Sequence, residues 1–318
     1  MAVITDGQLF ISETGEALDG ATDLVEIQRG TSVFTAAGTV ENFQRPLVRS
    51  YIDRQAPGAG LTRYWTTAFT TELRGTSATP SVSVLPEVHQ LLQASGLTAS
   101  FADATHSYIW TDQPNASPYS VTTRFEESTS GNYYVSADSN YTFTISGSAD
   151  NLATIAWSGV GEWATPTAMG SETEATAIGG TPMIAVSAYS LFGQSSGLVI
   201  RDYSITGGLE ITPRLDVAGG DGYAWPGTIS RPAPTSITLT VEAVQENTVT
   251  AWADWISATV ADVDLTLTAG ARSIALKLNN VSFNAPVLQQ GTPNMFALTG
   301  QASTAATGTP SSLTLEFT

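Results

Sequence analysis

One alternating stretch followed closely by a helix signal constrains the fold of this chain more than any other feature. In residues 62–74 (TRYWTTAFTTELR), Trp65, Phe69 and Leu73 fall on one side of a period-two strand. The other side carries polar residues, namely Tyr64, Thr66, Thr70 and Glu72. The alternation therefore predicts a strand with one face in a core and one polar face.

A short amphipathic helix is predicted over residues 85–96 (LPEVHQLLQASG). Pro86 suits the first turn of a helix, because its missing N–H costs no hydrogen bond there. Three apolar residues follow the spacing i, i+3, i+4 and share one face: Val88, Leu91 and Leu92. Gly96 stands where a left-handed residue ends a helix. Together, the two elements predict a strand against which one helix packs.

The rest of the chain indicates a mainly β fold. Short alternating runs recur between Gly, Ser, Asn and Asp turns, and only 13% of the 318 residues are charged. A hydrophobic content of 42% is enough for one large core or two ordinary ones. We expect two tandem antiparallel β-sandwich or barrel domains, each with one flanking α-helix.

The second half of the chain repeats the order of the first. Residues 236–244 (SITLTVEAV) alternate as residues 62–74 do, and a helix signal follows them. We expect that helix to have Asn247 as its N-cap and three residues on one face, namely Val249, Trp252 and Ile256. Residues 296–300 (FALTG) then match residues 155–159 (IAWSG). Strand, helix and meander occur twice, which favours duplication over two unrelated β-domains.

These patterns divide the chain into four parts. Residues 1–39 lack a sustained period and are interpreted as an N-terminal arm with one short strand. A first β-domain over 40–163 and a second over 181–318 flank residues 164–180, a Gly- and Thr-rich linker. Within the first domain, residues 102–118 are interpreted as a loop with two exposed aromatic residues, Tyr108 and Trp110.

Charge excludes ordinary nucleic-acid binding. The formal net charge is −17 with a sequence pI near 4.2, and Lys277 is the single lysine. Several arginines nevertheless crowd the first part of the chain: Arg29, Arg45, Arg49, Arg54, Arg63 and Arg74. A basic end and an acidic remainder allow head-to-tail association. The alternative is that the acidity serves solubility or reflects a salty habitat.

No constellation of residues indicates catalysis. The chain has no cysteine, and its two histidines, His89 and His106, have no partner at a metal-binding spacing. Neither a nucleophile elbow nor a phosphate loop is present. Glu126 and Glu127 are adjacent, so a strand would direct them to opposite faces, and we interpret both as solvated charges. We therefore expect no enzyme activity, no cofactor and no metal.

Other residues that could bind a ligand also have simpler interpretations. Asp216 and Asp221 flank a Gly-Gly pair and indicate a tight acidic turn rather than a calcium site. Four tryptophans fall on apolar stripes and are interpreted as core rather than as carbohydrate platforms: Trp65, Trp157, Trp252 and Trp255. No signal peptide and no apolar run long enough to span a bilayer are found, so we expect no membrane anchoring.

Two stretches together resemble a known family. Residues 65–97, with WTTAFTTELRG and then LPEVHQLLQASGL, resemble the major tail tube proteins of long-tailed bacteriophages. Residues 227–244 (GTISRPAPTSITLTVEAV) are similar to that family's Arg-x-Pro segment and the Ser-Ile-Thr strand that follows it. The resemblance implies tail-tube-like β-domains with a flanking helix, assembled into stacked rings around a bore through which DNA travels.

On this resemblance the chain is expected to be a structural virion protein that forms the phage tail tube, a negatively charged conduit for DNA delivery. The implied partners are copies of itself, in rings of three two-domain chains or six chains, with tape measure, tail terminator and distal tail proteins. DNA would pass through the bore without specific binding. The protein would be assembled in the host cytoplasm and reside in the virion tail. A surface adhesin or carbohydrate-binding β-sandwich is the alternative, and a hydrolase with an unrecognised acid pair is a third.

Two sets of residues are candidates for roles in such a tube. A Gly- and Pro-containing tip at residues 55–60 is flanked by three arginines that could contact the next ring: Arg49, Arg54 and Arg63. Glu72 and Glu242 lie on polar strand faces and are candidates to line the bore. The alternative places these two glutamates on an outer surface. No catalytic, cofactor or metal residue is carried over from the family.

Overall fold

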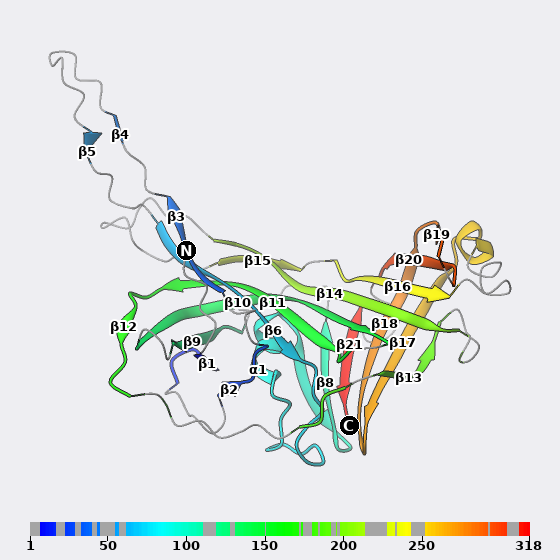
Figure 1. Ribbon diagram of the computed structural model, residues 1–318, viewed down its shortest axis with the longest axis horizontal. Coiled ribbons are helices and arrows are strands. Elements are labelled where there is room, and N and C mark those ends of the chain that lie inside the picture. The colour runs from blue at the N-terminus through cyan, green and yellow to red at the C-terminus, as the bar shows by residue number, and fades with distance from the viewer. Residues whose placement is uncertain are drawn as a thin grey trace.

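The computed structural model describes the polypeptide in separate ranges. These are residues 7–16, 23–28, 33–39, 43–44, 55–56, 62–110, 119–127, 131–149, 151–171, 173, 180–183, 185–191, 195, 198–213, 228–232, 234–242, 252–291, 293–303 and 312–318. Over these ranges the chain is mainly β, with antiparallel pairing (Figure 1). The mainly β prediction is therefore confirmed.

One sheet, which we call the long sheet, runs through both halves of the molecule. Its strand order is β3 (Val33–Thr39), β6 (Thr62–Glu72), β11 (Thr154–Trp163), β10 (Asn132–Ser148), β14 (Ile200–Pro213), β16 (Ser236–Glu242), β20 (Met295–Gln301) and β19 (Val287–Gln289). β10 pairs directly with β14, and Ile145 lies opposite Ile205. The sheet therefore passes from the first half of the chain to the second without a break.

Other strands pack over the long sheet. In the first half these are β2 (Leu24–Val25), β1 (Gly7–Glu13) and β9 (Val121–Glu127), which pair in that order and join the N-terminal part of β10. Phe34 of β3 stacks on Phe125 of β9 with ring centroids 5.8 Å apart. Because β3 and β9 are not hydrogen-bonded neighbours, this contact joins two layers, as in a β-sandwich.

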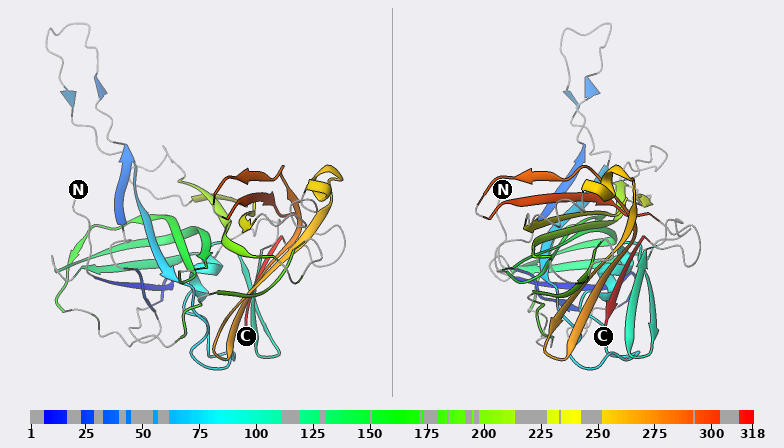
Figure 2. Two further views of the ribbon diagram at one scale, coloured as in Figure 1. Left: turned by 45° about the vertical axis from the view of Figure 1, so that its right-hand side comes forward. Right: turned by 90° about the vertical axis from the view of Figure 1, so that its right-hand side faces the viewer.

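In the second half, another set of strands forms what we call the second sheet. Its order is β13 (Ala185–Ser190), β17 (Val260–Ala269), β18 (Arg272–Phe283), β21 (Leu313–Phe317), β8 (Thr105–Trp110) and β7 (Thr98–Ala102). The β7–β8 hairpin precedes β9 in sequence, yet it extends a sheet built mostly from the second half (Figure 2).

Further pairings connect the sheets. Ser282 and Phe283 of β18 lie opposite Gln301 and Gly300 of β20, so the second sheet joins the long sheet at this point. β12 (Thr167–Ala168) pairs with β10, and β15 (Thr228–Pro232) pairs with β14. β4 (Phe43–Gln44) and β5 (Gln55–Ala56) pair with each other, and both stand well away from the body of the molecule (Figures 1 and 2). In sequence, β4 and β5 lie between β3 and β6.

A single hydrophobic core underlies both halves. Its buried residues form one continuous cluster from Leu9 to Phe317. The three residues of 62–74 predicted to face a core are all buried, namely Trp65, Phe69 and Leu73, and the last two belong to this cluster. Trp157 of β11 is also buried and contacts the rings of Tyr141 and Phe143. The boundaries expected at residues 40, 164 and 181 stay predictions.

A helix forms inside the range 85–96 but is shorter. α1 (His89–Ala94) buries Leu91 and Leu92, and Val88 just before it is also buried. The Pro86 carbonyl accepts the His89 N–H at 2.9 Å, which makes a tight turn before the helix begins. Gly96 has φ +91° and lies against Trp110, so it provides the expected left-handed stop. Residues 252–256 form a second helical segment, whereas Asn247 and Val249 lie outside the described residues.

The N-terminal region is not an arm with one short strand. β1, β2 and β3 all lie within residues 1–39, and β1 pairs with both β2 and β9. Three consecutive residues of β1 are buried, namely Leu9, Phe10 and Ile11. A strand that is buried on both faces shows an apolar run instead of alternation, so it lacks the period by which strands were recognised in the sequence.

The aromatic residues predicted to be exposed in residues 102–118 are instead buried. Tyr108 and Trp110 belong to β8, where they and His106 occupy alternate positions on the core side. Residues 111–118 lie outside the described part of the chain. The wrong prediction has a local cause. Asp103 and Ala104 form the tight turn of the β7–β8 hairpin with positive φ, and this turn contains no glycine that would have marked it in the sequence.

The tryptophans divide into two groups. Trp65 and Trp157 are core residues, as predicted. Trp252 and Trp255 are not, because they are 39% and 40% exposed and contact each other edge to face at 5.6 Å. Their apolar spacing therefore places them on an outer face of the helical segment 252–256, beside Ile256, which is also exposed.

Candidate functional site: the polar face of the long sheet

The side of the long sheet that faces away from the core carries mostly small hydroxyl side chains, and we call it the polar face. Its central positions on β6, β11, β10, β14, β16 and β20 include Thr70, Glu72, Thr142, Thr144, Ser146, Thr154, Ala156, Ser158, Ser204, Thr206, Thr238, Thr240, Glu242 and Thr299, and Tyr64, Glu162, Asp202 and Met295 lie on the same side. No lysine or arginine is among them. Successive side chains of a strand point to opposite faces of the sheet, so these residues lie on one face and the buried residues on the other.

Strand register places these residues in rows across the sheet. One row runs through six strands: Glu72, Thr154, Ser146, Ser204, Thr238 and Thr299. At about 4.8 Å between strands, such a row is about 24 Å long. Hydroxyls within the face bond across strands, with Thr144 Oγ1 3.1 Å from Thr206 Oγ1 and Ser146 Oγ 3.3 Å from Thr154 Oγ1. The face is therefore a broad, hydroxyl-rich surface shared by both halves.

Glu72, predicted to line a bore, lies on the polar face as an ion-paired carboxylate. Arg74 lies two residues further along the chain, and its Nη2 is 2.8 Å from Glu72 Oε2. The other terminal nitrogen of Arg74 is 2.5 Å from Glu26 Oε2. One guanidinium thus joins two carboxylates at the edge of the face, which lowers the negative charge that Glu72 presents.

Glu242, the second predicted bore residue, is ion-paired in the same way. Arg201 Nε donates to Glu242 Oε1 at 2.8 Å, and Arg201 Nη2 also contacts this oxygen. Arg201 comes from β14 and Glu242 from β16, so the pair bridges neighbouring strands. The two predicted residues share one face, and each is balanced by an arginine. Exposed Asp202 on β14 adds a carboxylate beside this row.

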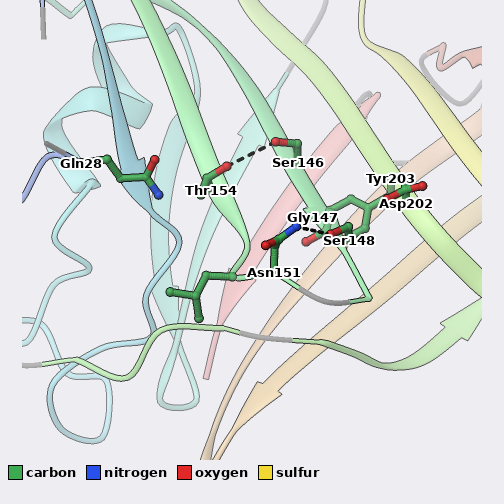
Figure 3. Close-up of a pocket in the computed structure, with 9 residues that line it drawn as sticks. Gln28, Ser146, Gly147, Ser148, Asn151, Thr154, Asp202 and Tyr203 are labelled. Atoms are coloured by element: carbon green, nitrogen blue, oxygen red, sulfur yellow. Dashed lines mark hydrogen bonds between the residues drawn. The ribbon is translucent and has the colours of Figure 1, made fainter. Parts of the chain in front are cut away.

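The polar face is hollowed at the turn between β10 and β11 (Figure 3). The cavity has a volume of about 540 Å³ and is lined by Gln28, Ser146, Gly147, Ser148, Asn151, Leu152, Thr154, Asp202 and Tyr203. The Tyr203 hydroxyl is buried without a hydrogen-bond partner, and a side chain at Gly147 would collide with it. Hydroxyl, amide and single carboxylate groups suit water or a neutral hydroxylated molecule, and they do not form an acid–base pair.

The arginines predicted to contact the next ring fall mostly outside the described residues. Arg49 and Arg54 lie there, and only the backbone of Arg63 is described, in β6 opposite Gly38. The described part of the same connection is the β4–β5 pair, with Phe43 opposite Ala56. This pair stands away from the body (Figure 1), whereas residues 57–60 of the predicted tip lie outside the described residues, so the predicted contact stays a prediction.

Both histidines have structural partners. His89 Nδ1 is 2.6 Å from the Tyr108 hydroxyl, and burial, with a smaller contribution from His106, lowers the pKa of His89 to about 4. His106 is not in a loop but in β8, where its Nε2 lies 2.8 Å from the Ser81 carbonyl and 3.1 Å from the Val84 carbonyl. Because carbonyls only accept, this nitrogen carries the proton. The two rings hold residues 81–89 against β8.

Glu126 is a buried anchor rather than a solvated charge. It is 1% exposed, pairs with Arg124 at 2.6 Å, and accepts hydrogen bonds from the N–H and hydroxyl of Thr173. Glu127 points to the other face and accepts from the Tyr134 hydroxyl at 3.2 Å. The two carboxylates therefore face opposite sides, as expected, and cannot act together on one bond. Asp216 and Asp221 lie outside the described residues.

Comparison with known proteins gives no family assignment. No model of a known protein family matches the chain, and no curated protein matches its sequence. Within the described ranges, no group of three His, Cys, Asp or Glu residues is placed to hold a metal ion. The same ranges contain no helix with the length and apolar character needed to cross a membrane. Function is therefore inferred from the residues and geometry of this chain.

The buried carboxyl group of Glu87 should make the stability of the protein depend on pH. Burial raises its pKa to about 7, although its carboxylate accepts the Glu26 N–H at 2.5 Å. The folded protein therefore keeps a proton that the unfolded chain releases near pH 4.5, so stability falls as pH rises from about 4.5 to 7. Glu87→Gln keeps the acceptor and removes the charge. We expect it to raise the free energy of unfolding at pH 8 by up to about 3 kcal/mol, and to change it little at pH 4.

The measurement is chemical denaturation of parent and variant from pH 4 to pH 8. His89, whose pKa is lowered, makes stability fall as pH decreases from about 6.5 to 4, in parent and variant alike. The difference between the two proteins therefore isolates Glu87. Glu16→Gln, at an exposed turn, is the matched control. If the free energy of unfolding changed with pH in the same way for parent and Glu87→Gln, the pKa of Glu87 would not be raised.

Proposed function

We propose that this chain is a structural virion protein of a bacteriophage tail, which self-assembles into stacked rings whose polar faces line the bore of a tail tube. The observation that supports this most is the continuous, hydroxyl-rich polar face that crosses both halves of the chain. Such a face needs a polar medium or partner over its full width. A water-filled bore through which DNA passes provides one.

The chemistry of the polar face suits passage rather than binding of DNA. Proteins hold DNA mainly by neutralising phosphates with lysine and arginine. On this face the nearest arginines, Arg74 and Arg201, are already paired with Glu72 and Glu242. Threonine and serine hydroxyls present no net charge, and the overall charge of −17 repels phosphate at longer range. DNA would therefore slide along the face.

Matching strand pairs support two tandem tail-tube-like domains. Across β6 and β11, Thr70 lies opposite Ala156, and seven consecutive pairs run from Glu72 to Thr66. Across β16 and β20, Thr240 lies opposite Ala297, and seven consecutive pairs run from Glu242 to Ser236. The FALTG and IAWSG segments thus occupy equivalent positions beside equivalent strands. We infer that 40–163 and 181–318 are duplicated units, each with one helix.

Two glycines at matching positions also support the duplication. A side chain at Gly159 would collide with the ring of Tyr141, and one at Gly300 would collide with Val281 and the ring of Phe283. Gly159 and Gly300 end the two matching segments, so each half places an aromatic ring over a glycine at the same point of the sheet. With two equivalent domains per chain, a ring of three chains would have six equivalent positions. Six chains per ring is the other arrangement.

The projecting β4–β5 segment supports stacking of rings. It extends from the end of the long sheet, where it could reach a neighbouring ring (Figure 2). Arg49, Arg54 and Arg63 flank the tip of this segment in sequence, and we propose that they approach acidic groups of the next ring. In the same proposal the tube surrounds a tape measure protein and meets tail terminator and distal tail proteins at its ends. The protein would be assembled in the host cytoplasm.

Negative-stain microscopy of the purified protein tests this proposal directly. We expect rings or tubes with a central bore, and native mass measurement of separated rings should give three chains. A protein that stays a monomer over a range of concentration and salt would contradict the proposal. A glycan-binding screen on the same preparation tests the adhesin alternative, which the exposed pair Trp252 and Trp255 favours. Loss of glycan binding in Trp255→Ala would support that alternative.

A further inference from the structure

The long sheet ends in two strands that have one partner each in the described part of the chain. At one end, β3 pairs with β6. At the other end, the outer edge of β20 is shared by the end of β18 and by β19, and β19 pairs with β20. Strand edges with unused backbone N–H and C=O groups are templates for pairing with another chain.

The internal junction between the halves supplies the template. There, β10 of the first half pairs antiparallel with β14 of the second. Thr144 lies opposite Thr206, and Ile145 lies opposite Ile205. Both isoleucines are fully buried, so the junction joins the cores as well as the backbones. A repeated structure that uses this junction once within the chain can use it again between chains.

β19 is the counterpart of β10. Leu288 of β19 lies opposite Phe296 of β20. In the first half, the residue that matches Phe296 is Ile155, and Ile145 of β10 lies opposite it. Leu288 therefore corresponds to Ile145, and Val287 corresponds to Thr144. Ile145 is 0% exposed, whereas Leu288 is 56% exposed. The difference is that β10 has β14 beside it.

β3 is the counterpart of β14. Phe34 of β3 lies opposite Thr67 of β6. In the second half, the residue that matches Thr67 is Ile237, and Ile205 of β14 lies opposite it. Phe34 therefore corresponds to Ile205, and Thr35 corresponds to Thr206. Phe34 also packs against the core, as Ile205 does.

We propose that β19 of one copy pairs antiparallel with β3 of the next copy, with Leu288 opposite Phe34 and Val287 opposite Thr35. This pairing covers the exposed Leu288 and removes both open edges. The contact is head to tail, because it uses different edges of the two copies, so it generates rings or open filaments. The inference names the mating edges of the self-assembly proposed above and rests on it.

Pairing of this kind makes the polar faces of successive copies continuous. Each copy contributes the eight strands of the long sheet. With strands about 4.8 Å apart, three copies give a circumference of about 115 Å and a backbone diameter of about 37 Å, before strand tilt widens it. A bore of that size leaves room for a DNA duplex after side chains are included.

Disulfide trapping tests the register, since the chain has no cysteine of its own. Directly opposite residues of antiparallel strands have Cα atoms about 4.5–5.5 Å apart, which is within disulfide range. A chain with Val287→Cys and Thr35→Cys should give, on oxidation, a ladder of covalent oligomers that ends at a closed ring. A mixture of the two single variants should give covalent dimers only, because the contact is head to tail.

The matched control shifts the register by one residue. In a chain with Val287→Cys and Phe34→Cys, the two side chains would lie on opposite faces of the sheet and should remain at least tenfold slower to cross-link. Leu288→Lys should also raise the concentration needed for assembly at least tenfold, because it places a charge in a buried position. Val82→Lys, at an exposed apolar residue outside the sheets, should have no such effect.

The outcomes separate the two proposals. Tubes that form normally while the Val287–Thr35 cysteines cross-link no faster than the shifted control would overturn the edge pairing and leave the tail tube intact. Rapid cross-linking in register, with no tube under any condition, would support the edge pairing and contradict the tail tube. Equal assembly of Leu288→Lys and the parent would also overturn the pairing.

Discussion

Replacing Trp157 with alanine will lower the free energy of unfolding by about 3–5 kcal/mol. Trp157 is buried in the first half, where its ring contacts Tyr141 and Phe143. Its indole N–H also donates to Thr71 Oγ1 at 3.0 Å within the core. The substitution removes the largest fully buried side chain in the described part of the protein and leaves a buried hydroxyl without its partner. Both losses act in the same direction.

The loss should appear in one transition that includes both halves. β10 and β14 pair over seven residues across the junction, and the buried residues form one cluster. Leu298 matches Trp157 in the second half and is also buried. Leu298→Ala should therefore shift the same transition, by about 2–5 kcal/mol. Shared cooperativity follows from the shared core and not from the similarity of the halves.

Chemical denaturation followed by far-UV circular dichroism and by calorimetry provides the measurement. Thr299→Ala is the control, because Thr299 neighbours Leu298 but lies exposed on the polar face, and its effect should stay within about 0.5 kcal/mol. Two separate transitions, one moved only by Trp157→Ala and the other only by Leu298→Ala, would show that the halves unfold independently.

Local patterns were enough to predict the elements that alternate strictly. β6 and β16 each have one buried and one polar face, so period two identified both strands and their buried residues. The matching segments 155–159 and 296–300 were found for the same reason, and the structure places them beside those strands. Arg74 follows Glu72 by two residues just beyond the end of β6, so the contact between their side chains is local in sequence.

Other elements could not be predicted because their causes are not local. β1 is buried along consecutive residues, so it shows no alternation. β14 contains Gly207 and Gly208, the second with φ +102°, and these glycines interrupt a pattern that Tyr203, Ile205 and Leu209 otherwise follow. The β10–β14 pairing and the Arg201–Glu242 ion pair join distant segments. No pattern within one segment specifies such partners.

The exposed tryptophans show a related limit. Periodicity predicts that Trp252 and Ile256 share a face, and they do lie in a helical segment. It does not say what that face meets, and here the face is open. In α1 the corresponding apolar residues are buried. The same spacing therefore led to a correct burial prediction in one half and a wrong one in the other.

Arginines placed on the polar face should make the tube bind and retain DNA. Ser158 and Thr299 occupy matching positions of β11 and β20, and both are exposed on the polar face. Ser158→Arg with Thr299→Arg adds two guanidinium groups per chain with no carboxylate partner built beside them. Exposed substitutions of this kind change stability by about 0.5 kcal/mol or less, so rings and tubes should still form.

The expected result is retention of duplex DNA inside the variant tubes. Each neutralised phosphate contributes about 0.9 to the slope of log affinity against log salt, and rings repeat the new charges along the tube. Tubes assembled with a labelled short duplex should hold it in a nuclease-protected form at low salt and release it as salt rises. Parent tubes should release it at all salt concentrations, because their polar face offers no unpaired cation.

The control carries the same two changes on the second sheet. Ser100→Arg with Thr268→Arg adds equal charge at exposed positions of β7 and β17, away from the polar face. If these arginines lie on the outside of the tube, bound DNA will be accessible to nuclease, whereas DNA held on the polar face will be protected. Protection by the second-sheet variant and not by the polar-face variant would place the bore on the other side of the molecule, because only charges inside a bore can shield the duplex they bind.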